Sequence, residues 1–121
     1  MPNSEKYVDA FVMPLSKSNI EAYRIFAEQM ATIAKKHGAL EYVNYISDDV
    51  KPGKETSYAQ AVKLNADELV AQSWVVYKSR EDRERANNAI MEDESFKALN
   101  QHIPVDQKRM FTGGFTVLRG L

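Results

Sequence analysis

The spacing of apolar residues switches along the chain between the strand period of two and the helix period of about 3.6, and each switch marks a predicted element. Residues 6–13 are rich in β-forming side chains, and Pro14 is expected to close this strand because proline cannot donate to a ladder. Apolar residues then recur every three or four positions from Ile20 to His37, which predicts a helix with one buried face. Gly38 provides the left-handed residue that commonly ends such a helix.

The start of this helix is predicted from a capping box. Ser18 stands three residues before Glu21, so each side chain can satisfy the backbone N–H of the other. After the helix, residues 40–47 favour a second strand. The polar segment 48–57 contains a Pro-Gly pair and favours a loop.

The second half of the chain predicts a strand, a helix and a final strand. The third strand is expected in two parts, a weaker one over 58–64 and a stronger one over 69–77, with a turn or bulge between them. Ser79 precedes two acidic residues, which predicts the start of a helix. This helix breaks near Asp93 and is followed by a short helix. The last strand is expected over 109–118.

The order β-α-β-β-α-β is that of a ferredoxin-like fold, an α+β class in which a four-stranded antiparallel sheet carries both helices on one face. We predict that residues 1–121 form one such domain, because 121 residues suit a single hydrophobic core. Gly113 and Gly114 fall in the middle of the last strand, where they predict a bulge or a close contact with neighbouring atoms.

Several predicted strands are apolar on both faces. In the first strand Phe11 and Met13 point one way, whereas Val8 and Val12 point the other, and the strand around Trp74 has the same property. Two helices can cover only one face, so the other face would form an exposed patch. We predict that a second copy covers it, which makes a homodimer through the sheet face, a dimeric α/β barrel. The alternative is an amphipathic outer face with partly exposed aromatic side chains.

The composition limits the classes of function. Sixteen basic residues against 17 acidic ones leave a net charge of -1, and the basic residues are scattered, so no nucleic-acid partner is expected. No apolar run reaches the roughly 18 residues of a membrane-spanning helix, and the N-terminal segment lacks the pattern of an export signal. The chain has no cysteine, which fits a reducing compartment. We therefore expect a cytoplasmic protein with no membrane partner.

Six segments of the chain together resemble one known family. They are residues 7–12, 37–42, 48–54, 61–63, 73–77 and 108–115. In this order they are similar to the YbaA-like family of small bacterial proteins of unknown function. The resemblance implies a ferredoxin-like dimeric α/β barrel in the cytoplasm of a bacterium. It implies no particular reaction, because proteins of one fold serve many functions.

His37 is the first candidate for chemistry. Histidine titrates near neutral pH and could act as a general acid or base, and a single histidine can also be an axial ligand of haem. The alternative is that His37 continues the apolar stripe of its helix and satisfies terminal carbonyls. The two histidines, His37 and His102, lie far apart and lack metal-ligand spacing, so we predict no metal site and no cofactor. Asp48 and Asp49 could hold a cation, but a solvated turn is the alternative.

Aromatic residues in the strands suggest a ligand pocket between the sheet and the helices. The expected walls are Tyr7, Tyr42, Tyr45, Tyr58, Trp74, Tyr77 and Phe115, with polar contacts from Asp9, Asn44 and Arg109. The alternative is that these aromatic residues form the core or the dimer interface.

Three functions remain open from the sequence. The first is a homodimer that binds a small apolar or aromatic ligand, in a cavity without a convergent acid–base pair. The second is a cofactor-independent enzyme, oxygenase- or isomerase-like, acting on a small aromatic or carbonyl substrate. In that case His37, Tyr42 or Asp9 would transfer protons, and two titratable groups would lie within hydrogen-bond reach at one cavity. The third is a structural interaction module with a filled interior.

Overall fold

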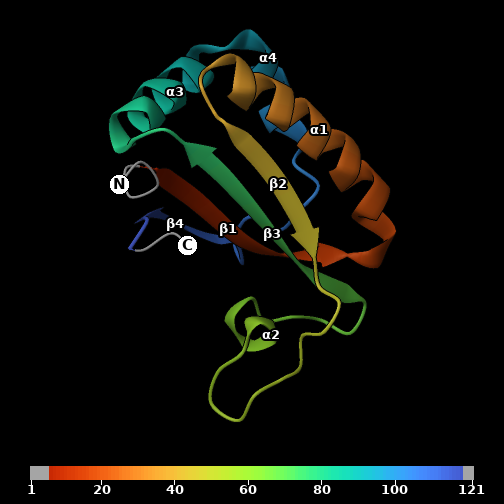
Figure 1. Cartoon of the computed structure of the whole chain (residues 1–121). Coiled ribbons are helices and arrows are strands. Elements are labelled where there is room, and N and C mark those ends of the chain that lie inside the picture. The colour runs from red at the N-terminus through yellow and green to blue at the C-terminus, as the bar shows by residue number, and fades with distance from the viewer. Residues whose placement is uncertain (1–5, 119–121) are drawn as a thin grey trace.

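A four-stranded antiparallel sheet, in the order β2-β3-β1-β4, carries α1, α3 and α4 on one face (Figure 1). The structure is a computed structural model and describes residues 6–118. In chain order the elements are β1 (Tyr7–Ser16), the 3-10 turn η2 (Lys17–Asn19), α1 (Ile20–Lys36), β2 (Glu41–Ile46), α2 (Tyr58–Ala61), β3 (Glu68–Tyr77), α3 (Arg80–Glu92), α4 (Glu94–Leu99), the 3-10 turn η3 (Asn100–His102) and β4 (Phe111–Thr116). The α+β, ferredoxin-like class predicted from the sequence is confirmed.

The register of the strands decides which side chains face the helices. Asp9 lies opposite Val75 on β3 and Gly114 on β4, and Phe11 lies opposite Ser73. Because directly opposed residues share a face, the odd-numbered residues of β1 and β3 and the even-numbered residues of β2 and β4 point toward the helices. The other residues form the outer face of the sheet.

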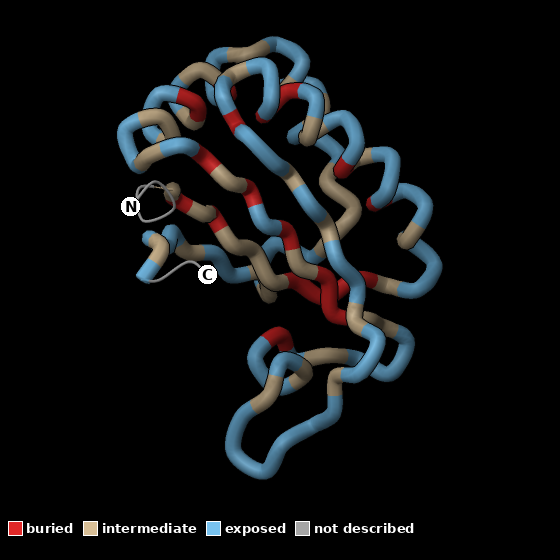
Figure 2. The backbone as a smooth tube through the Cα atoms, viewed as in Figure 1, coloured by how far each residue is buried: buried red, intermediate tan, exposed pale blue. Residues whose placement is uncertain are grey.

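Two groups of buried side chains fill the space between the sheet and the helices. One group contains Ile33, Ala34, Ala39, Val75, Tyr77, Ala86 and Ile90. The other contains Met13, Leu15, Tyr23, Ala27 and Ala71. Figure 2 shows the central strands and the inner sides of the helices buried, while α2 and the long loop before it are mostly exposed. Most of the core therefore lies on the helix-covered side of the sheet, although Pro14 and Val70, which point to the other side, are also buried.

The outer face of the sheet carries exposed apolar side chains. They are Val43, Tyr45, Trp74, Phe111 and Phe115. Tyr45 and Trp74 meet edge to face, with ring centroids 5.6 Å apart. This agrees with the expectation that both faces of the sheet are apolar. Within residues 6–118, no helix is long and apolar enough to cross a bilayer.

Pro14 does not end the first strand, contrary to the sequence prediction. It lies opposite Val70 on β3. The backbone N–H of Val70 donates to Oγ of Ser47, and its C=O accepts the N–H of Ser47, so both groups face the chain just after β2. Pro14 therefore turns its nitrogen away from β3. On that side the pairing with β4 ends at Val12, so no ladder bond is lost and β1 continues to Ser16.

The predicted capping box of α1 does not form. Ser18 lies inside the 3-10 turn, where its hydroxyl contacts the hydroxyl of Ser16 at 2.9 Å. The helix begins two residues later, at Ile20, and Asn19 makes no side-chain cap bond. The end of the helix is as predicted, because Gly38 has a φ of +119° after the last turn.

The weak strand expected over 58–64 is wrong, because this segment forms the one-turn helix α2. The side chain of Ser57 accepts the backbone N–H of Gln60 at 3.1 Å and caps the turn, which competes with an extended chain. The stronger half of the prediction is confirmed as β3. Ser79 caps α3 by accepting the N–H of Asp82, as its position predicted.

The two glycines of β4 pair in continuous register with β1, without a bulge. Gly114 is the point of close contact, because a Cβ there would lie 2.1 Å from the hydroxyl oxygen of Tyr7. Tyr7 can lie over this strand only because position 114 has no side chain.

Candidate functional site

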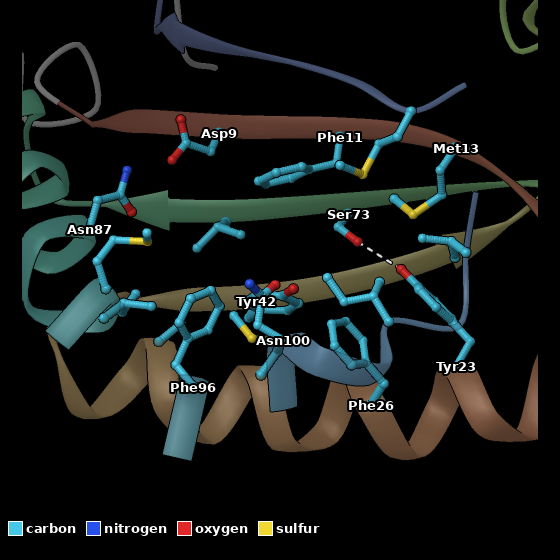
Figure 3. Close-up of a pocket in the computed structure, with 18 of the residues that line it drawn as sticks. Asp9, Phe11, Met13, Tyr23, Phe26, Tyr42, Ser73, Asn87, Phe96 and Asn100 are labelled. Carbon is cyan, nitrogen blue, oxygen red and sulfur yellow. Dashed lines mark hydrogen bonds between the residues drawn. The ribbon is translucent and has the colours of Figure 1, made fainter. Parts of the chain in front are cut away.

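A cavity of about 440 Å³ lies between the helix-facing side of the sheet and the helices (Figure 3). Most of its wall is apolar. The apolar lining residues are Phe11, Met13, Phe26, Met30, Ala34, Val75, Ile90, Met91, Phe96, Ile103, Val105 and Met110. Four of the five methionines of the chain are among them, and methionine side chains adapt their shape to a ligand and make favourable contacts with aromatic rings.

The polar lining residues are few. They are Asp9, Tyr23, Tyr42, Ser73, Tyr77, Asn87 and Asn100. They come from both the strands and the helices, so the cavity exists only when the two layers are packed together. Among the residues that the structure describes, no lysine, arginine or histidine lines the cavity.

Asp9 occupies one end of the cavity and is held by Arg83 of α3. The Nε atom of Arg83 lies 3.0 Å from Oδ1 and 3.1 Å from Oδ2 of Asp9, and Nη2 lies 3.0 Å from Oδ1. Asp9 is 6% exposed, so the ion pair is largely shielded from water. The carboxylate raises the pKa of Arg83 above its usual value by accepting these hydrogen bonds. Arg83 therefore stays protonated beside Asp9 at neutral pH.

A cluster of three oxygen atoms occupies a second position on the wall. The hydroxyl of Tyr23 lies 2.9 Å from Oδ1 of Asn44 and 2.9 Å from Oγ of Ser73, and Oγ of Ser73 lies 2.5 Å from the same Asn44 oxygen. Tyr23 and Ser73 line the cavity, whereas Asn44 lies behind them on β2. The sidechains join α1, β2 and β3 at this point.

The phenols of the cavity stay protonated well above neutral pH. Burial raises the pKa of Tyr42 and that of Tyr23. Burial also raises the pKa of Tyr77 to about 12, and the nearby negative charge of Asp9 adds to the rise. These groups act as neutral hydroxyls rather than as bases.

The structure brings together several of the residues singled out from the sequence. Asp9, Tyr42 and Tyr77 line the cavity. Tyr7 and Asn44 lie beside it without lining it: the guanidinium carbon of Arg83 is 5.0 Å from the ring centroid of Tyr7, and Asn44 holds the hydroxyl cluster from behind.

Three predicted site residues lie elsewhere. Trp74 is on the outer face because its register places it opposite Ala10, so its assignment to the pocket is corrected. Arg109 pairs with Glu68 at 2.7 Å and with Asp106 at 2.8 Å, and does not line the cavity. His37 lies at the end of α1, where Nε2 is 2.7 Å from Oδ2 of Asp93, and it too is outside the cavity wall.

Of the other aromatic residues expected in the pocket, Tyr45 and Phe115 also face outward, and Tyr58 is exposed on α2. Strand periodicity separates the two faces, but it does not say which face the helices cover. The assignment of these rings needed the packing of the helices.

Several lining residues were missed from the sequence. Tyr23, Phe26 and Met30 belong to the apolar stripe of α1, a pattern that by itself indicates only a buried helix face. Ser73 is a buried polar residue among helix-facing positions of β3 that are otherwise apolar or aromatic, which is a signal that could have marked it. Asn87 and Asn100 gave no such signal, because polar residues on helices are usually exposed.

Sequence comparisons identify related proteins without an assigned activity. The family model described as "Protein of unknown function (DUF1428)" matches residues 6–107. The uncharacterized protein YbaA of Escherichia coli (strain K12) is 41% identical over 110 residues, which cover 91% of this chain and 94% of YbaA. YbaA of Shigella flexneri matches to the same extent.

Solved structures with the same fold have low sequence identity. SnoaB, described as a cofactor-independent oxygenase from Streptomyces nogalater, has a TM-score of 0.60 and 14% identity over 97% of both chains. A NIPSNAP family protein of unknown function from Agrobacterium tumefaciens has a TM-score of 0.60 and 15% identity, over 96% of this chain and 91% of that one. A putative antibiotic biosynthesis monooxygenase from Nitrosomonas europaea has a TM-score of 0.56 and 11% identity, over 95% and 92% of the chains. These likenesses show a shared fold only.

Proposed function

The chain belongs to the YbaA-like DUF1428 family of proteins of unknown function, and from that premise we propose that it binds a small apolar or aromatic ligand between its sheet and its helices. The observation that carries the proposal is the cavity of about 440 Å³ with an apolar wall and a few polar groups. Its volume lies in the range of about 300–1,000 Å³ that is typical of small-molecule sites. A structural module with a filled interior would not need such a cavity.

The geometry favours binding over catalysis. A cofactor-independent enzyme, oxygenase- or isomerase-like, is the alternative, and Asp9 beside Tyr77 in the cavity is the observation in its favour. However, Asp9 already accepts three contacts from Arg83, and the phenols keep their protons. Asp9 is therefore held in a structural ion pair, and the acceptor position left on Oδ2 suits a hydrogen bond from a bound ligand. The third candidate, His37, lies outside the cavity wall.

The binding site can be tested by NMR of methyl-labelled methionine. A thermal-shift screen against neutral aromatic compounds, aromatic acids, quinones and nucleotides would first identify a ligand, because binding to the folded state raises the melting temperature. We expect the hit to shift the methyl signals of Met13, Met30, Met91 and Met110, which line the cavity. The indole signal of Trp74, on the outer face, is the control. A ligand that moves Trp74 and leaves the methionines unchanged would contradict the proposed site.

We also propose that two copies of the chain pair through the outer face of the sheet. Trp74 is 46% exposed and Phe115 is 58% exposed on this face, and no described helix covers them. Exposed apolar patches of this kind mark interaction surfaces, and a second copy would bury both faces in one step. Because a second copy brings the same apolar face, the pairing needs no other protein.

Sedimentation velocity would test the dimer. We expect the unchanged chain to sediment as a dimer and Trp74→Lys to sediment as a monomer, because the lysine would place a charge in the apolar interface. Ile25→Lys is the control, since Ile25 is 51% exposed on α1, away from the outer face of the sheet. An unchanged chain that remains monomeric at high micromolar concentration would refute the pairing.

We place the protein in the cytoplasm of a bacterium. The absence of cysteine fits a reducing compartment, and the related YbaA proteins are bacterial. Fractionation of cells that express the chain at its natural level would test this, and recovery in the periplasmic fraction would refute it.

A further inference from the structure

The wall of the cavity offers no counter-ion to an anionic ligand. Asp9 is the one carboxylate in the described lining, and no cationic side chain is present there. Arg83 neutralises Asp9 from outside the lining and is also paired with Glu84, so its charge is already satisfied. A carboxylate or phosphate group would have to lose its hydration without gaining a cation, which is strongly unfavourable.

The Asp9 end of the cavity favours a ligand group that donates a hydrogen bond. An ionised carboxylate only accepts hydrogen bonds, and each of its oxygens can accept about two. Oδ1 of Asp9 receives two contacts from Arg83, whereas Oδ2 receives one. Oδ2 therefore keeps an acceptor position for a donor on the ligand.

The hydroxyl cluster, formed by the oxygens of Tyr23, Ser73 and Asn44, also favours a ligand group that donates a hydrogen bond. Three oxygens of Tyr23, Ser73 and Asn44 lie within 2.5–2.9 Å of one another, but only the two hydroxyls carry hydrogens. Two hydrogens can close at most two of the three contacts, so the cluster has spare lone pairs and no spare hydrogen. A ligand that donates to the cluster leaves both internal bonds in place, whereas a ligand that only accepts must take a hydrogen from one of them.

The two ends are separated by apolar side chains. Asp9 lies opposite Val75 and Ser73 lies opposite Phe11, which places the two groups on neighbouring strands about 7 Å apart along the strand direction. Figure 3 shows the ring of Phe11 between them. The phenols of Tyr42 and Tyr77 and the amides of Asn87 and Asn100 can either donate or accept, so they do not change the preference of the two ends.

We propose that the cavity selects a neutral aromatic ligand that donates a hydrogen bond at each end, of the dihydroxyarene class, and rejects carboxylates and phosphates. This inference rests on the proposed function and adds the polarity of the ligand. Its basis is the excess of acceptors over hydrogens at both polar ends and the absence of a cation from the described wall.

Four probes that share one ring system would test the polarity. They are 2,6-dihydroxynaphthalene, 2,6-dimethoxynaphthalene, naphthalene and naphthalene-2,6-dicarboxylate, and their dissociation constants would be measured by equilibrium dialysis at neutral pH. We expect the diol to bind at least about tenfold more tightly than the dimethoxy ether and naphthalene, which corresponds to one or two net hydrogen bonds. The dicarboxylate should show no binding at the same concentrations.

Two substitutions test which residues give the preference for the diol. Ser73→Ala removes one hydroxyl but keeps the contact between Tyr23 and Asn44, so it should weaken binding of the diol about tenfold and leave binding of naphthalene unchanged. Asp9→Asn removes the charged acceptor and should reduce the preference for the diol over the ether. Ser18→Ala, at an exposed serine outside the cavity, is the control and should change neither value. Because Asp9→Asn weakens an ion pair, its naphthalene binding also checks that the cavity is intact.

The outcomes separate the two proposals. If the ether or the dicarboxylate binds as tightly as the diol, the polarity inference is wrong and the aromatic site stands. The inference also fails if Ser73→Ala weakens naphthalene as much as the diol. If none of the four probes binds the unchanged chain, the proposed aromatic ligand is refuted together with its polarity.

Discussion

Asp9 of β1 and Arg83 of α3 are joined by three short contacts of 3.0–3.1 Å, although they lie 74 residues apart in the chain. The pair connects the central strand to a helix at the end of the cavity. Glu84 contacts the same guanidinium group, and the ring of Tyr7 lies beneath it. The position of α3 over the sheet is therefore set by a polar contact as well as by apolar packing.

Arg83→Gln should lower the free energy of unfolding by about 2 kcal/mol, because it leaves the carboxylate of Asp9 buried without its cation. This value is below that of a fully buried pair, since the side chain of Arg83 is 20% exposed. Urea denaturation monitored by circular dichroism would measure the change. Arg85→Gln on the same helix is the control. The side chain of Arg85 is 73% exposed in its pair with Asp82, so we expect a loss below about 0.5 kcal/mol. Equal losses would show that the buried pair has no special role.

Gly114→Ala should destabilise the fold by about 1–3 kcal/mol, the usual cost of overpacking. The new Cβ would lie 2.1 Å from the hydroxyl oxygen of Tyr7 and 2.7 Å from two of its ring carbons, so the ring would have to move. Gly113→Ala is a matched control, because its Cβ would be 3.4 Å from the nearest atom, a ring carbon of Phe115. The midpoints of thermal unfolding should differ clearly between the two variants. A Gly114→Ala variant as stable as the unchanged chain would mean that Tyr7 does not occupy this position.

Asp93 should make the fold less stable in acid. Its carboxylate accepts hydrogen bonds from His37 and from the backbone N–H of Ser95, and these, with nearby Lys36, hold the pKa of Asp93 well below its ordinary value. A carboxyl group with a depressed pKa in the folded state contributes stability above its unfolded-state pKa of about 3.9. This stability is lost as the pH falls below that value toward the folded-state pKa.

Asp93→Asn tests this dependence while keeping a side chain that can cap α4. We expect the melting temperature of the variant to fall less than that of the unchanged chain between about pH 4 and pH 2. Asp49→Asn is the control, because the side chain of Asp49 is 74% exposed and lies 3.6 Å from Lys51. If the melting temperatures of both variants fall in acid as much as that of the unchanged chain, Asp93 does not supply this stability.

The two serines that precede helices should differ in their effect on stability. Ser79→Ala removes the side chain that accepts the N–H of Asp82 at 3.1 Å, so we expect a loss of about 1 kcal/mol. Ser18→Ala should cost only a few tenths of that, since Ser18 lies in the 3-10 turn and does not cap α1. Chemical denaturation of both variants would compare them. A larger loss of stability for Ser18→Ala than for Ser79→Ala would support the capping box expected from the sequence.

Local signals predicted the end of α1 and the start of α3 well, but they misplaced the end of β1 and missed α2. The cap of α3 at Ser79 and the end of α1 at Gly38 depend on residues within a few positions, so the sequence alone indicated them. Pro14 was misplaced because its effect depends on which neighbour its nitrogen faces, and that follows from the pairing with Val70 and the end of β4. The turn capped by Ser57 was missed because a single serine competes with a weak strand pattern.

The sequence by itself determined the order of the elements, the α+β class and the apolar character of both sheet faces, because periodicity and caps act over short stretches of chain. Only the tertiary structure decided that Tyr42 and Tyr77 face the cavity while Trp74 faces outward, and that Asp9 meets Arg83. It also joined Tyr23 to Ser73 across 50 residues. These relationships depend on strand register and on the side of the sheet that the helices cover. Both are set by the packing of the whole chain, and no local pattern encodes them.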